Sequence, residues 1–154
     1  MRSARCAVLL AVLVVASGCA RTVDGDPRAG EASSTTVSVR ELIGTWRGTY
    51  HCAQGETAVD LDVTSTSQPG SDLPRAAAVM TFGPVPSNPR VERGSYRMTV
   101  VNEHGNTFRF TQQEWISRPA EYVMVDLVGE LVGNTLSGGV AGPGCTTFRV
   151  VRAR

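Results

Sequence analysis

Lysine is missing from this sequence, since all 15 of its basic residues are arginines. Together with abundant alanine, valine and glycine, this bias is typical of a GC-rich genome. Arg2 and Arg5 lie in an N-terminal segment that we expect to be removed, so the 14 acidic side chains slightly outnumber the basic ones that remain. Nucleic-acid binding needs a concentrated basic footprint, and this balance argues against nucleic acid as a partner.

Recognisable catalytic motifs are missing too: there is no serine-centred elbow, no phosphate-cradling glycine loop and no zinc-spaced cluster. Of the two histidines, His51 falls on the polar face of a predicted strand and His104 in a His-Gly-Asn turn. Both are expected to be solvated rather than to act as general bases. Asp60 and Asp62 share one polar face, but a glycosidase pair or a calcium site would need converging partners. We therefore predict a non-enzyme without metal or cofactor.

The apolar run Ala7 to Ala16 is too short to span a bilayer as a mature helix. Arg2 and Arg5 precede it and small residues follow it, which is the pattern of an export signal. The sequence Val-Ala-Ser-Gly-Cys that ends it resembles the lipobox of bacterial lipoproteins. That resemblance implies removal of residues 1–18 and attachment of lipid to the thiol of Cys19. The alternative is ordinary secretion with cleavage nearby.

A lipid on Cys19 would place the protein on the extracytoplasmic face of the cell membrane, because two or three acyl chains make a durable anchor. Residues 19–39 are rich in Gly, Asp, Ser and Thr and show no apolar periodicity, so they are predicted to form a flexible tether. Residues 40–154 have the length of one modest domain.

The stretch Gly44 to Cys52 predicts the first strand of that domain. Alternate residues of a strand face opposite sides, so Trp46, Gly48, Tyr50 and Cys52 share a core face. The glycine between two large rings suggests a bend or a close crossing. Alternation or apolar runs predict further strands around Val59–Val63, Ala76–Phe82, Tyr96–Val100, Phe108–Phe110, Tyr122–Val128, Leu136–Val140 and Phe148–Val150.

About eight short antiparallel strands with brief turns predict an all-β domain, an up-and-down barrel whose last strand closes on the first. A β-sandwich is the alternative. If Cys6 leaves with the signal and Cys19 carries lipid, Cys52 and Cys145 are the cysteines that remain, and we predict a disulfide between them. Two free thiols, or a metal pair with His51, are the competing interpretations.

Gly44-Thr45-Trp46 resembles the Gly-x-Trp that opens lipocalin-type and avidin-type barrels. Lipocalins stack a late arginine on this tryptophan, a position that Arg152 or Arg149 would take here; otherwise Trp46 is simply a core aromatic residue. With Phe148 and Val150 inside, Arg152 points inward at the end where Trp46 enters. WRGTYHCAQG and GPGCTTF resemble domains of uncharacterised actinobacterial, mycobacterial-type envelope lipoproteins, which implies no activity.

Trp115 lies among polar residues just before Pro119, where it forms either a binding rim or a corner that plugs one barrel end. Two functions remain: a non-catalytic interaction or structural module whose partner is another envelope protein, or a carrier of a small apolar ligand. A hydrolase with an unrecognised site ranks below both. Trp46, Tyr50, Trp115 and Arg152 are the candidate ligand or barrel-end residues.

The two functions differ in what fills the barrel, because a carrier should contain a cavity of a few hundred cubic ångströms. Many large residues are predicted to point inward, which favours a filled core and the interaction module. They are Trp46, Tyr50, Met80, Phe82, Met98, Phe108 and Phe110.

Overall fold

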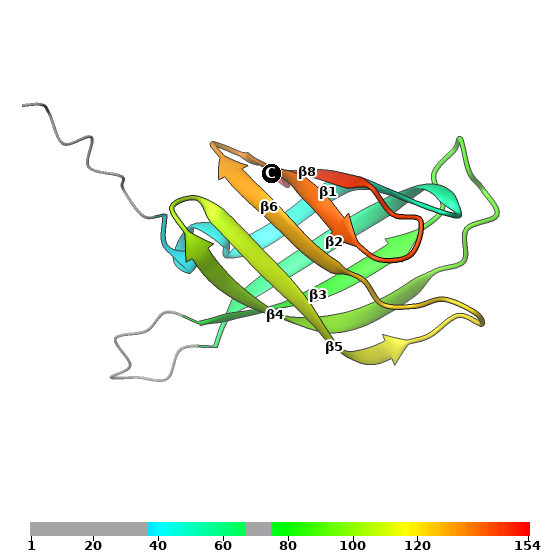
Figure 1. Cartoon of the computed structure of the whole chain (residues 1–154), viewed down its shortest axis with the longest axis horizontal. Coiled ribbons are helices and arrows are strands. Elements are labelled where there is room, and N and C mark those ends of the chain that lie inside the picture. The colour runs from blue at the N-terminus through cyan, green and yellow to red at the C-terminus, as the bar shows by residue number, and fades with distance from the viewer. Residues whose placement is uncertain (1–36, 67–74) are drawn as a thin grey trace, which may run out of the picture. The chain divides into compact units, whose positions relative to one another are not determined.

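The computed structural model of the chain describes residues 37–66 and 75–154. The predicted signal peptide, Cys19 and residues 20–36 of the predicted tether lie outside the described residues. Eight antiparallel strands pair in chain order and close into a barrel, with the last strand hydrogen-bonded to the first (Figure 1). The predicted up-and-down barrel is therefore confirmed, and the sandwich alternative is wrong.

A short 3-10 helix precedes the strands, which are joined by turns and short loops. In order, the elements are η1 (Val39–Leu42), β1 (Gly44–Cys52), β2 (Gly55–Ser65), β3 (Ala76–Gly83), β4 (Gly94–His104), β5 (Thr107–Ser117), β6 (Asp126–Val132), β7 (Thr135–Ala141) and β8 (Thr147–Arg152).

The core lies inside the barrel and is built from alternate residues of each strand, as period-2 patterning dictates. The large residues predicted to point inward all do so, and each is at most 4% exposed. Phe148 and Val150 of β8 are buried as well, which settles the parity of the last strand. These side chains fill the middle of the barrel.

One strand lies later in the chain than expected: residues 122–125 form a loop, and β6 begins only at Asp126. Glu121 has a φ of 63°, a left-handed conformation that interrupts an extended chain. The backbone N–H and C=O of Val125 both bond to the Tyr96 hydroxyl, at 3.2 and 3.0 Å, instead of to a neighbouring strand. Side-chain contacts thus replace the ladder that the apolar run Tyr122–Val128 suggested.

The helix η1 covers one end of the barrel, which we call the closed end (Figure 1). Trp46 Nε1 donates to the carbonyl of Leu42 at 2.8 Å, so the first strand holds the helix in place. The Arg152 guanidinium lies 4.2 Å from the centroid of the Trp46 ring and donates to the carbonyls of Ile43 and Glu41. Trp46 is therefore both a core residue and the platform for a late arginine.

The folded domain starts slightly before residue 40, where the sequence placed the end of the tether. Val39 is 4% exposed within the core, and the Val37 N–H donates to the Gly105 carbonyl at 3.0 Å. Apolar periodicity cannot reveal two isolated valines that dock onto a barrel end.

The seam between β1 and β8 closes the barrel, with Trp46 opposite Arg152 and Tyr50 opposite Phe148. A Cβ atom on Gly48 would collide with the β8 backbone, so the glycine permits the close crossing. At the closed end the Ala153 N–H donates to the Thr45 carbonyl at 2.8 Å. At the other end the predicted Cys52–Cys145 disulfide is confirmed, joining residues 93 positions apart.

Candidate functional site: a pocket beside the disulfide

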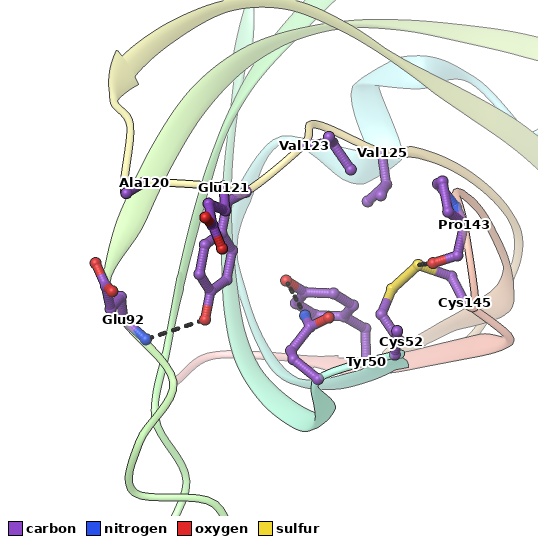
Figure 2. A pocket seen from close by; sticks show the side chains of 12 residues that line it. Tyr50, Cys52, Glu92, Ala120, Glu121, Val123, Val125, Pro143 and Cys145 are labelled. Carbon is purple, nitrogen blue, oxygen red and sulfur yellow. Dashed lines mark hydrogen bonds between the residues drawn. A yellow bond between two sulfur atoms is a disulfide. The ribbon is translucent and has the colours of Figure 1, made fainter.

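A pocket of about 380 Å³ lies at the barrel end opposite η1, which we call the pocket end (Figure 2). The β1–β2 turn, the β3–β4 loop, the β5–β6 loop and the β7–β8 loop all contribute to its lining. Strand pairing brings these four segments together although they are far apart in the sequence. The site is thus a product of barrel closure.

Tyr50 of β1 lines the pocket from the core side and is 4% exposed. Its hydroxyl accepts a hydrogen bond from Gln54 Nε2 at 3.3 Å, and the same amide donates to the Thr57 hydroxyl at 3.3 Å. Burial raises the pKa of Tyr50 to about 12, because the phenolate would be poorly solvated there. The pocket therefore has a neutral hydroxyl at its inner side.

Tyr122 of the β5–β6 loop forms a wall of the pocket. Its ring stacks on Phe82, with centroids 5.4 Å apart, and its hydroxyl accepts the backbone N–H of Glu92 at 3.2 Å. Figure 2 shows this bond at the side of the pocket that lies opposite the disulfide. The β5–β6 loop is thus held in place by two contacts of Tyr122, one through its ring and one through its hydroxyl.

The opposite wall contains the Cys52–Cys145 disulfide and Pro143, and Val123 and Val125 extend the apolar lining (Figure 2). The Val125 backbone is held by the buried Tyr96 hydroxyl, whose pKa burial raises above its usual range. Val123 is 58% exposed at the rim. The site therefore combines apolar surface with a few fixed polar groups, which is the usual composition of a small-molecule site.

Trp115 does not line the pocket, although it lies near it. Its ring packs edge-on against Tyr96 at 5.2 Å and against Phe82 at 6.2 Å, and Arg118 lies 5.8 Å from its centroid. Trp115 is half-buried, so it belongs to an aromatic cluster behind the Tyr122 wall.

The remaining candidate residues are spread over the barrel. Trp46 and Arg152 form the closed end, so of the four candidates only Tyr50 reaches the pocket. His51 and His104 are exposed. Asp60 lies 3.5 Å from Arg47 in a salt bridge, and Asp62 accepts the Thr45 hydroxyl at 2.7 Å.

Sequence reasoning missed the loop residues of the pocket, namely Gln54, Glu92, Glu121 and Tyr122. Their positions depend on loop conformation, and at these residues the sequence indicated only turns or a strand.

No group of three metal-binding side chains occurs in residues 37–66 and 75–154. Within those ranges no helix has the length and apolar character needed to cross a membrane.

Comparison of the chain with protein-family models, with curated proteins and with solved structures finds no match in any of the three.

Proposed function

We propose that this protein is a lipid-anchored protein of the cell envelope that binds a small organic molecule at the pocket end of its barrel. The observation that carries the proposal is the pocket of about 380 Å³, within the range of about 300 to 1,000 Å³ usual for such sites. It lies above a filled core, so the ligand would sit at the mouth and not deep inside.

The lipobox-like sequence before Cys19 supports attachment to the extracytoplasmic face of the membrane. The chain reaches the barrel through Val37 and η1 at the closed end, whereas the pocket lies at the other end. In a lipid-anchored protein the tether would therefore join the barrel at the end opposite the pocket. The lining combines apolar groups with the neutral Tyr50 hydroxyl and Gln54 amide and with two acidic residues, Glu92 and Glu121, which supports binding of an organic molecule.

The proposal is tested on the mature chain from residue 19, with Cys19→Ser to keep it free of lipid, using the fluorescence of N-phenyl-1-naphthylamine. Ala120→Trp places an indole at an exposed lining position and should abolish the fluorescence increase. Val132→Trp adds the same group at a residue that is 67% exposed and remote from the pocket, so it should bind as wild type does. Equal binding by all three proteins would refute the proposal.

A non-catalytic interaction or structural module is the second candidate function, and the filled barrel interior supports it. Its partner would be another envelope protein that contacts the surface or the loops. Native mass spectrometry of the protein purified from its own host separates the two candidates. A small molecule retained on the protein supports the binding protein. A stoichiometric complex with another protein, from which this chain dissociates without any bound small molecule, supports the module.

A further inference from the structure

The pocket carries negative charge and no positive charge of its own. Glu92 and Glu121 line it, and no arginine or histidine does. Both glutamates are exposed, and no salt bridge joins either of them to another described residue. The lining of the pocket therefore includes two acidic residues that form no salt bridge with another described residue.

Two arginines that adjoin these loops in the sequence, Arg93 and Arg118, contact residues outside the pocket lining or its rim. Arg93 lies over Gly83, where its Nη1 would be 3.1 Å from a Cβ atom on that glycine. Arg118 lies over the ring of Trp115. Because the chain as a whole is nearly neutral, the acidic character is local to this site.

The position of Glu121 is fixed by its backbone. It is the one non-glycine residue with positive φ in the described part of the chain, and its neighbour Tyr122 is held by Phe82 and by the Glu92 backbone. Figure 2 shows Glu121 and Glu92 on the same side of the pocket, across from Pro143 and the disulfide. This side is therefore acidic and aromatic, while the other is apolar.

Resting on the proposed function, we infer that the ligand is a cationic amphiphile, with a protonated amine or similar cation joined to an apolar, ring-sized body. The cation lies between Glu92 and Glu121, where the face of Tyr122 adds a favourable cation–π contact. The apolar body lies against Val125 and the disulfide. A carboxylate or phosphate ligand of the same size is repelled at the rim.

The test compares three probes with one carbon skeleton: 4-phenylbutylamine, 4-phenylbutan-1-ol and 4-phenylbutyrate. Their dissociation constants are measured on the C19S chain by displacement of N-phenyl-1-naphthylamine or by direct calorimetry. An exposed charge contact changes affinity by up to about fivefold, and here both glutamates attract the amine and repel the carboxylate. The amine should therefore bind at least about fivefold more tightly than the carboxylate. The preference should shrink as salt is added.

Two matched variants separate local from global charge. E92Q/E121Q should reduce the preference for the amine at least about threefold, whereas E41Q/E130Q removes the same charge from exposed sites outside the pocket and should leave it unchanged. A smaller preference, or one that E92Q/E121Q does not reduce, overturns the inference. If the alcohol still binds and Ala120→Trp abolishes that binding, the proposed function survives; if no probe binds wild type, both fail.

Discussion

Gly48 has no side chain at the point where β8 crosses β1, and a Cβ atom there would collide with the backbone of Arg149 and Val150. Gly48→Ala should therefore lower the free energy of unfolding by about 1 to 3 kcal/mol, because backbone must shift to make room. Urea denaturation measures the change. Gly139→Ala on β7 is the control, since its Cβ would make only an ordinary contact 3.9 Å from Thr146, and a change above about 0.5 kcal/mol is not expected. Equal effects of the two substitutions would contradict this account of the seam.

Tyr50 links the pocket to stability at alkaline pH. Its pKa is raised from 10.0 to about 12, so between these values the unfolded chain loses a proton that the folded chain keeps. The free energy of unfolding is thus unaffected by this group below pH 10 and should fall by about 2 to 3 kcal/mol as pH rises to about 12.

Denaturation at a series of alkaline pH values, with tyrosinate absorbance followed in parallel, measures this fall. Tyr96 is buried as well and contributes in the same direction, so Tyr50→Phe should reduce the loss without removing it. An alkaline loss of the same size in Tyr50→Phe would assign the effect to other groups.

Among the elements, the β5–β6 connection depends most on side chains. The Tyr96 hydroxyl bonds both backbone groups of Val125, and the Asp126 carboxylate accepts the Gln112 N–H at 2.9 Å. Tyr96→Phe leaves the two Val125 groups without that partner, so the free energy of unfolding should fall by about 1 to 3 kcal/mol. Hydrogen exchange should accelerate at residues 122–125 more than in β2. Uniform acceleration throughout the barrel would show that the hydroxyl has no local role.

The strands themselves were largely predictable, because each barrel strand has one buried face and one solvated face. Val59, Leu61 and Val63 illustrate this: they alternate with polar residues and are all buried. The start of β6 was not predictable, since it depends on a hydroxyl from β4 and on the left-handed Glu121. The pocket was predictable only in part. Tyr50 and the disulfide follow from strand parity and from the small number of cysteines, whereas the positions of Glu92 and Glu121 depend on loop geometry.

For the whole molecule, the Cys52–Cys145 disulfide ties the first strand to the segment before the last across 93 positions. Cys52→Ser/Cys145→Ser should lower the free energy of unfolding by about 2 to 5 kcal/mol, because the unfolded chain regains a long loop. Calorimetry should show a lower Tm with the barrel still formed at room temperature. Wild type treated with reductant should match the variant, and unchanged stability in both would show that strand pairing alone holds the seam.

The β1–β8 seam also brings the start of β1 and the end of β8 to the same pole, where Ala153 bonds to Thr45. The chain could therefore begin at a different strand while the arrangement of the strands in the barrel stays the same. A short linker from β8 to η1, with new ends opened in the exposed Gly133–Asn134 turn, would retain all eight neighbour pairings as a circular permutant. The new ends of such a permutant would lie at the pole opposite the pocket, because the Arg152 N–H bonds to the Asn134 carbonyl there.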